Sequence, residues 1–272
     1  MILCSSSVRT NSPFETAMES IANAGFKDID LLAINTWCHI NPAELAINFD
    51  SIIDNVEKIF VKNGLTMHAM NIGFSHQMHD RKPESAEQNL KECDALCRFM
   101  KYFGASVAAL QPLQKDVNRD PWEVLDDCII SFKEYSECTS RYGIKLGLEL
   151  HVNSPFENRE AMDYLFHKMP DAGIIYDPSH FTSQGMGLNA SEFIIANSVH
   201  THLRDSGQDN IQTPLGEGSV DFEWVAQKLT EYQYNGHFSI EYLDNPKWDA
   251  LLEAVKMKEL IEGNEKFNAI NK

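Results

Sequence analysis

Eight short apolar runs, each followed by a segment with helical periodicity, account for most of the chain. The apolar runs predict strands over residues 1–8, 28–34, 65–71, 105–110, 144–150, 172–176, 199–204 and 237–242. The intervening segments predict helices over residues 12–24, 41–64, 84–103, 120–143, 159–168, 189–197, 221–234 and 248–262. The pattern therefore predicts eight strand-then-helix units in succession.

Local residues mark the ends of several predicted helices. Three helices open on a capping residue followed by Pro and then, two residues later, by Glu; the capping residues are Ser12, Asn41 and Asp120. Such residues satisfy or remove the free N–H groups of a first helical turn. A glycine follows the segments that end near residues 24, 63, 103 and 142, as is usual after a helix. The polar tail over residues 263–272 is expected to fray.

A single domain over residues 1–272 is predicted, because no Pro/Ser-rich linker or block of charge interrupts the chain. Parallel strands joined by helices need cover on both faces. Eight such units favour an α/β fold in which eight parallel strands close into a TIM barrel with outer helices. An open doubly wound sheet is the alternative. In a barrel, functional groups belong at the carboxyl ends of the strands.

The stretch from Ser198 to Asp205, Ser-Val-His-Thr-His-Leu-Arg-Asp, carries the strongest chemical signal. Side chains alternate along a strand, so His200, His202 and Arg204 share one face. These groups are costly to bury without an anionic partner. Three carboxylates end other predicted strands, namely Glu149, Asp177 and Glu241. One His and three carboxylates predict a divalent metal site, whereas His200 is expected one layer deeper.

Two further residues are candidates for holding substrate oxygens at this mouth. His180 follows the strand-end Asp by three residues, and Arg204 lies nearer the mouth than the candidate metal ligand on its strand. A guanidinium can donate a two-pronged hydrogen bond to a substrate anion. The alternative for Arg204 is an ion pair with Asp205 or another acid of the rim.

Three more residues stand at predicted strand ends. His151 is a candidate for substrate contact, with plain solvent exposure as its alternative. His68 and Gln111 are expected near the ends of the third and fourth strands, where each could touch substrate or be a satisfied core residue. Residues 214–220, Pro-Leu-Gly-Glu-Gly-Ser-Val, form a Gly-rich loop that is expected to fold back over the mouth.

Charge and composition exclude several partners. The formal charge of −17 disfavours nucleic acid, whose phosphates an acidic surface repels, but is no obstacle to a small sugar. The six cysteines include no CxxC pair, which favours reduced, buried thiols. No apolar run approaches 18 residues, and no basic region followed by an apolar core opens the chain. We therefore expect a cytoplasmic protein without membrane contact.

With these residues placed, the chain resembles the xylose isomerase-like TIM barrels, a superfamily of sugar phosphate isomerases and epimerases. The resemblance is carried by Gly-Leu-Glu-Leu-His at 147–151, Asp-Pro-Ser-His at 177–180, His-Leu-Arg-Asp at 202–205, Pro-Leu-Gly-Glu-Gly-Ser-Val-Asp at 214–221 and Ser-Ile-Glu-Tyr at 239–242. The resemblance covers nearly the whole chain, and the motifs stand in this order and spacing. They are fairly specific for the superfamily and poorly specific for substrate.

The resemblance implies roles for particular positions. Ketose 3-epimerases of this family hold a divalent ion, often manganese, at the positions that match Glu149, Asp177, His202 and Glu241. The two matching Glu residues also move the proton, and the His that matches His180 contacts the substrate. Those enzymes carry an Arg six residues beyond the metal-binding His, where this chain has Gln208. That departure leaves the substrate open.

The activity expected on these grounds is that of a divalent-metal-dependent sugar isomerase or epimerase. The ion would chelate a carbonyl and the adjacent hydroxyl and stabilise an enediolate, while Glu149 and Glu241 remove and return the proton. Mixed carboxylate and imidazole ligands suit manganese, magnesium or cobalt, with manganese expected first and zinc less favoured.

Other activities stay open. A leaving group on the next carbon would turn the same site into a lyase or dehydratase that acts on a keto-sugar or keto-inositol. A barrel that binds sugar without turnover and an endonuclease IV-like hydrolase are weaker alternatives, the latter because Gln111 stands where that class has a His. Barrels of this size often form homo-oligomers, although no stretch of the sequence identifies an interface.

Overall fold

The barrel predicted from the strand pattern is confirmed. The structure, a computed structural model, describes residues 1–35, 37 and 39–270. Its eight strands are parallel, pair in sequence order and close where β8 pairs with β1. The strands are β1 (Ile2–Ser5), β2 (Asp28–Ile34), β3 (Thr66–Gly73), β4 (Val107–Leu110), β5 (Lys145–Glu149), β6 (Ile174–Tyr176), β7 (Ser198–Leu203) and β8 (Phe238–Ile240).

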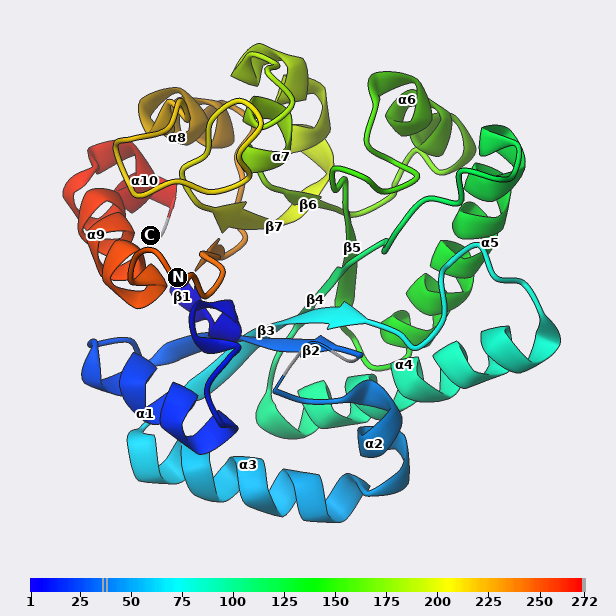
Figure 1. Cartoon of the computed structure of the whole chain (residues 1–272), viewed down its shortest axis with the longest axis horizontal. Helices are drawn as coiled ribbons and strands as arrows, with labels where there is room; N and C mark the ends of the chain where they lie inside the picture. Colours follow the sequence, from blue (N-terminus) through cyan, green and yellow to red (C-terminus); the bar gives the residue numbers. More distant parts are fainter. Residues whose placement is uncertain (36, 38, 271–272) are drawn as a thin grey trace.

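Helices surround the strands (Figure 1). The α-helices are α1 (Phe14–Asn23), α2 (Pro42–Ile47), α3 (Phe49–Asn63), α4 (Pro83–Phe103), α5 (Pro121–Ser140), α6 (Arg159–Lys168), α7 (Ser179–Thr182), α8 (Phe222–Glu231), α9 (Ala250–Gly263) and α10 (Glu265–Ile270). Two 3₁₀ helices are η1 (Ser6–Arg9) and η2 (Leu188–Asn197). The apolar core lies mainly between the helices and the outer faces of the strands.

Two of the three predicted helix caps form as expected. The side chains of Asn41 and Asp120 each accept two backbone N–H groups at the starts of α2 and α5. α1 differs, because Pro13 rather than Ser12 occupies its cap position and no side chain caps it. Gly64 ends α3 with a φ of 65°, a left-handed conformation that glycine adopts without a Cβ penalty.

The single helix predicted over residues 41–64 is wrong, because the chain leaves the helical conformation at Asn48. The φ and ψ of Asn48 are −114° and 37°, which ends α2 and starts α3 in a new direction. The break lets α2 pack on α4 while α3 packs on α1. The predicted helix over residues 189–197 is also tighter than expected, since η2 is a 3₁₀ helix.

The prediction that residues 263–272 fray is wrong for the described part of this tail. Residues 265–270 form α10, and Phe267 is fully buried. Its ring meets the ring of Phe238 edge to face, with centroids 5.1 Å apart. α10 packs beside α8 and α9 (Figure 1), so burial of Phe267, together with packing of Ile270 against the core, holds this segment in place. Residues 271 and 272 lie outside the described residues.

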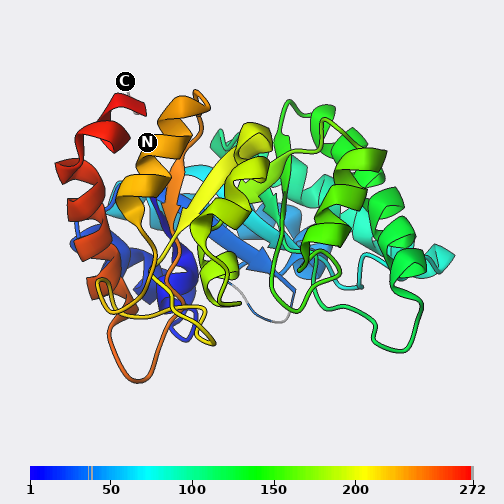
Figure 2. The same ribbon diagram turned by 90° about the horizontal axis from the view of Figure 1, so that it is seen from above.

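The parallel barrel brings all strand ends together at one side. Figure 2 shows the two chain termini at one side of the barrel and the loops after β7 and β8 (yellow and orange) extending from the other. The candidate residues come from strand ends and therefore meet at this loop side. In the described part of the chain, no helix is both long and apolar enough to cross a bilayer.

We predict that Gly173→Ala destabilises the barrel. A Cβ at this position would lie 2.4 Å from the backbone oxygen of Leu146, which cannot move without disturbing the pairing of β5 with β6. The expected loss in the free energy of unfolding is about 1–3 kcal/mol, measured by urea denaturation. Gly263→Ala is the control, because nothing lies within 4 Å of the Cβ added there. Equal unfolding midpoints for the two variants would contradict the prediction.

Candidate metal and substrate site

The structure brings the four predicted metal ligands together. Glu149 ends β5, Asp177 follows β6, His202 lies in β7 and Glu241 follows β8. One candidate ligand atom of each lies within 4.8 Å of those of the other three, and all four residues are buried. Adjacent parallel strands place these side chains at one level of the barrel, which explains why residues from 149 to 241 converge.

One nitrogen of the His202 imidazole contacts both candidate proton-moving carboxylates. Its Nδ1 atom is 2.8 Å from Oε1 of Glu149 and 3.2 Å from Oε2 of Glu241. Burial favours the neutral ring, but the charge of Glu241 and the contacts with Asp30 and Glu149 outweigh it and hold the pKa of His202 well above its usual value. Burial likewise opposes ionisation of Glu149, yet His180 and His202 hold its pKa well below the usual range.

Each of the two Glu side chains also accepts a hydrogen bond from an amide on another strand. Nδ2 of Asn71, in β3, donates to Oε1 of Glu241 at 2.5 Å. Nε2 of Gln111, which follows β4, donates to Oε2 of Glu149. Sequence reasoning missed Asn71, although a polar residue at the end of a predicted strand was the available signal. The amides fix the orientation of both carboxylates.

Arg204 forms buried ion pairs with two of the candidate metal ligands. Its Nη2 atom is 2.7 Å from Oδ2 of Asp177, and its Nη1 atom is 3.2 Å from Oε2 of Glu241. Its Nε donates to the hydroxyl of Ser179. The alternative expected for Arg204 was an ion pair with Asp205 or another acid, and it is confirmed for the other acids Asp177 and Glu241. Arg204 is 2% exposed but still borders the cavity described below, so it connects these carboxylates with the cavity.

The rings of the two predicted His residues at the mouth lie against each other, with their planes inclined by 47°. The ring centroids of His151 and His180 are 4.1 Å apart. Nε2 of His180 lies 3.5 Å from Oδ2 of Asp177, and His180 is buried. His151 borders the cavity, and burial together with the neighbouring His180 lowers its pKa to about 4. His151 is therefore neutral at physiological pH.

His68 does not lie at the mouth, so its predicted place there is wrong. It is the third residue of β3, and its Nε2 is 2.7 Å from Oδ1 of Asp28, the first residue of β2. This pair lies at the amino end of the barrel, opposite the site. β3 continues to Gly73, two residues beyond the predicted end, and Asn71 occupies the level expected for His68.

Asp205 anchors the Gly-rich loop that was expected over the mouth. Its carboxylate accepts the backbone N–H groups of Ser206, Gly216, Gly218 and Val220 at 2.8 to 3.3 Å. The loop is thereby tied back to the end of β7. A Cβ at Gly218 would lie 2.1 Å from Oδ1 of Asp205, so the close approach of the loop requires glycine.

A cavity of about 710 Å³ opens above the site. Its lining residues are Trp37, Asn71, Gln111, His151, Val152, Asn153, Ser183, Gln184, Arg204, Asp209, Ile211, Glu241 and Leu243. The volume lies in the range of small-molecule sites. Of the two Glu side chains, Glu241 borders this cavity, whereas Glu149 lies behind the amide of Gln111 and is fully buried.

A second buried acid lies beneath the site. Oδ2 of Asp30, in β2, is 3.1 Å from Nε2 of His200 and 3.4 Å from Nε2 of His202. Burial opposes its ionisation, but both His residues outweigh that effect and keep the pKa of Asp30 well below its usual value. Burial lowers the pKa of His200. Sequence reasoning missed Asp30, because it lies inside an apolar strand without a motif.

The charges and donors of this group fit a divalent metal ion. The buried carboxylates are Asp30, Glu149, Asp177 and Glu241. Two cations face them, Arg204 and protonated His202, so negative charge is in excess. Oε2 of Glu241 is buried without a hydrogen bond. Three carboxylates and one imidazole, with one carboxylate oxygen that has ion-pair contacts but no hydrogen bond, form a donor set that divalent ions use.

The model of the xylose isomerase-like TIM barrel family matches residues 18–259. The chain belongs to this family.

Similar proteins of known sequence include an inosose dehydratase of Lactiplantibacillus plantarum. It is 22% identical over 183 residues, which cover 55% of this chain and 61% of that protein. An uncharacterised protein of Methanocaldococcus jannaschii is 31% identical over 154 residues, 52% of this chain and 49% of that protein. The chain thus aligns with about half to three fifths of the length of these curated relatives.

Solved structures share the whole fold at low identity. The D-allulose 3-epimerase of Methylomonas sp. in complex with D-allulose has a TM-score of 0.76 and 16% identity, with 96% of each chain covered. A xylose isomerase-like TIM barrel protein of Mycobacterium smegmatis in complex with magnesium has a TM-score of 0.75 and 17% identity, covering 97% of this chain and 92% of that one. At these identities the likeness shows the fold.

We predict that Arg204→Ala lowers the free energy of unfolding by about 3–5 kcal/mol in metal-free protein, because it leaves the carboxylates of Asp177 and Glu241 buried without their cation. Thermal and urea unfolding measure the effect. Lys62→Ala removes an ion pair between two side chains that are more than half exposed and is expected to leave the unfolding midpoint unchanged. Equal midpoints for both variants would show that Arg204 does not balance the buried charge.

Proposed function

We propose that the protein is a divalent-metal-dependent enzyme that moves a proton at the carbon next to a carbonyl of a ketose-like sugar, as a sugar epimerase or isomerase. The observation that carries this proposal is the pair of carboxylates, Glu149 and Glu241, that converge on one imidazole nitrogen of His202. Family membership supports the reaction class, because solved structures of similar fold include ketose 3-epimerases.

Glu149 and Glu241 are the proposed proton-moving groups. The amides of Gln111 and Asn71 hold one oxygen of each carboxylate, so the other oxygens are aimed at the shared centre. Two carboxylates that reach a carbon from opposite faces can remove a proton on one face and return it on the other. This exchange inverts the carbon, which is the chemistry of an epimerase.

Asp177, His202 and the same two Glu residues are the proposed metal ligands. A divalent ion held by them supplies Lewis-acid stabilisation of the negative charge that develops on the substrate oxygens. Manganese suits this ligand set, as do magnesium and cobalt. His202 must give up its proton to serve as a ligand, so metal binding is expected to weaken as the pH falls.

His151, Arg204 and His180 are the proposed substrate-binding groups. His151 is neutral and borders the cavity, and its Nδ1 donates to the carbonyl oxygen of Val152, so its Nε2 can accept a hydrogen bond from substrate. Arg204 also borders the cavity while it holds Asp177 and Glu241. His180 lies against His151, and its Nε2 is 3.2 Å from Nη2 of Arg204. It therefore acts on substrate by positioning these two residues, or contacts substrate directly after a small movement of its ring.

A dehydratase that acts on a keto-inositol is the second candidate. Inosose dehydratases of Lactiplantibacillus plantarum and Glaesserella parasuis are both similar in sequence to part of this chain. Loss of a proton next to a carbonyl followed by loss of hydroxide from the next carbon is elimination, and the same two Glu residues can supply its base and acid.

We predict that Glu149→Gln and Glu241→Gln each lower turnover by at least about 100-fold without unfolding the protein, because the amide cannot take up a proton. The assay is incubation of the manganese-loaded protein with free ketoses, ketose phosphates and inosose in deuterated water. An epimerase places deuterium on one carbon and releases no water, whereas a dehydratase yields an unsaturated or diketo product.

Glu160→Gln on the exposed surface of α6 is the control and should retain full activity. Near-normal turnover in either site variant would remove that Glu from the mechanism. Absence of exchange and of elimination with every sugar tested would overturn the proposed reaction class.

We predict that each chain binds one divalent ion at the mouth of the barrel. Extensive dialysis against a chelator should abolish turnover, and manganese should restore it. Asp177→Asn is expected to weaken manganese binding by roughly 10- to 100-fold, measured by calorimetric titration, because it removes one anionic ligand. Asp163→Asn, in an exposed ion pair of α6, is the matched control. Unchanged affinity in the Asp177 variant would exclude this residue as a ligand.

A further inference from the structure

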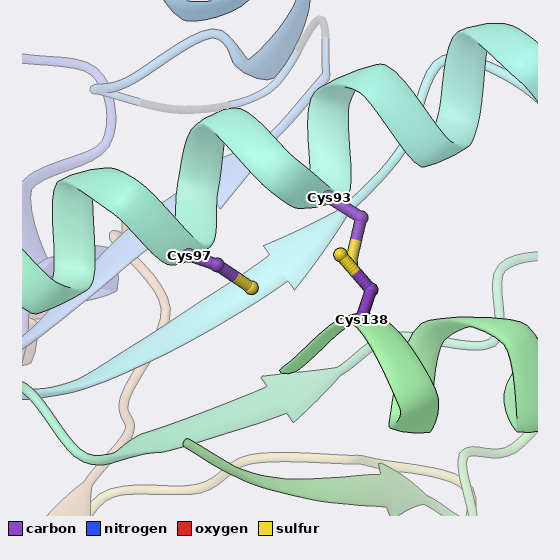
Figure 3. Close-up of side chains that lie close together, drawn as sticks. All are labelled: Cys93, Cys97 and Cys138. Atoms are coloured by element: carbon purple, nitrogen blue, oxygen red, sulfur yellow. The ribbon is translucent and has the colours of Figure 1, made fainter. Parts of the chain in front are cut away.

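Three cysteine side chains converge between α4 and α5, away from the barrel mouth. Cys93 and Cys97 are four residues apart in α4, and Cys138 lies in the last turn of α5. Figure 3 shows the sulfur atoms of Cys93 and Cys97 directed from one face of α4 toward the space in which Cys138 lies. Their sulfur atoms all lie within 4.8 Å of one another. We call these residues the cysteine group.

We propose that the cysteine group is a binding site for a single thiophilic ion of low coordination number, Cu(I). Thiolates are soft ligands that select such ions over the hard divalent ions suited to the barrel mouth. The proposal is independent of the proposed enzymatic function, because no residue of the cysteine group borders the cavity.

The geometry of the group matches a small ion with three sulfur ligands. The i and i+4 positions of a helix lie on one face, so α4 presents two ligands side by side. The neighbouring helix α5 supplies the third ligand. Sulfur atoms that bind one ion at about 2.3 Å must lie roughly 4 Å or less from each other. The three sulfurs lie within 4.8 Å of one another, so they need to approach by less than about 1 Å to bind one ion.

Burial selects Cu(I) over zinc at this site. Cys93, Cys97 and Cys138 are 0%, 2% and 4% exposed. Structural zinc sites are almost always four-coordinate. Among the described residues no fourth His, Cys, Asp or Glu joins the group. Cu(I) binds two or three thiolates without a further ligand. Three buried sulfurs therefore complete the coordination of Cu(I).

The thiols in the group interact chiefly with one another. Hydrogen bonds from Cys93 and Cys97 lower the pKa of Cys138, and Arg141 adds to this effect. The same contacts raise the pKa values of Cys93 and Cys97. Each thiol that binds Cu(I) as a thiolate releases its S–H proton to solvent as the sulfur–copper bond forms, and no electrons are transferred.

A half-buried hydrogen bond also joins α4 to the segment that follows α5. The hydroxyl of Tyr142, just after α5, donates to Oδ1 of Asp94 in α4 at 2.6 Å. An ion bound by the cysteine group would link α4 to α5 directly, so its binding is expected to raise the unfolding temperature.

The test is titration of the reduced, metal-free full chain with Cu(I) under anaerobic conditions, in competition with a chromophoric Cu(I) chelator. We expect one tightly bound Cu(I) per chain, a raised unfolding temperature, and sulfur as the only ligand type in the copper X-ray absorption spectrum. Cys93→Ser, Cys97→Ser and Cys138→Ser should each weaken binding more than about tenfold.

Cys128→Ser is the matched control, because Cys128 is a fully buried thiol of α5 outside the group. It should bind Cu(I) as the wild type does, and so should Glu241→Gln at the barrel mouth. Retention of Cu(I) by the triple variant Cys93→Ser/Cys97→Ser/Cys138→Ser, or nitrogen and oxygen ligands in the wild-type spectrum, would overturn the proposal. A thiol count of the denatured wild type as isolated checks for a disulfide. If two free thiols are missing and reductant restores them, a disulfide in the cysteine group would replace the proposed copper site.

Discussion

The constraint on which the site depends is the burial of several carboxylates at one end of the barrel. A buried carboxylate without a partner is costly, and here Glu149, Asp177 and Glu241 share one small volume. Arg204 and His202 are the cations that make this arrangement stable, and each of them contacts two of the acids. The remaining excess of negative charge is what makes the group suited to a divalent ion.

This constraint extends one layer into the barrel. The interior beneath the mouth holds a second polar set, in which Asp30 contacts both His200 and His202. A carboxylate behind a metal-binding imidazole fixes the orientation of the ring and raises its basicity. Asp30 is therefore placed to support His202 from below while Glu149 and Glu241 face it from above. Polar side chains replace part of the apolar packing inside the barrel, and their contacts hold the site in a fixed arrangement.

The proposed site would support either of the two proposed reactions. Both begin with removal of a proton next to a carbonyl, and the fate of the resulting anion depends on what the next carbon carries. Under the proposed function, the residues that border the cavity outside the candidate metal group, such as Trp37, Asn153 and Ile211, are the ones placed to contact the rest of the substrate.

The sequence by itself determined the architecture and the centre of the site. Alternating apolar strands and amphipathic helices specify a parallel barrel, and period-2 alternation near each strand end identified Glu149, His202 and Glu241. Strand ends were predictable only to within two or three residues. That error misplaced His68, whereas Asn71 was the residue at the correct level of β3.

Tertiary structure alone decided the contacts between distant elements. Which acid pairs with Arg204, how Asp30 reaches His202 from β2, and why Phe267 anchors a polar tail all depend on strands and helices far apart in the chain. The same holds for Cys138, which meets Cys93 and Cys97 only because α5 packs on α4. Local patterns record which face of an element is buried, but not what it is buried against, because that partner is set by the closure of the whole barrel.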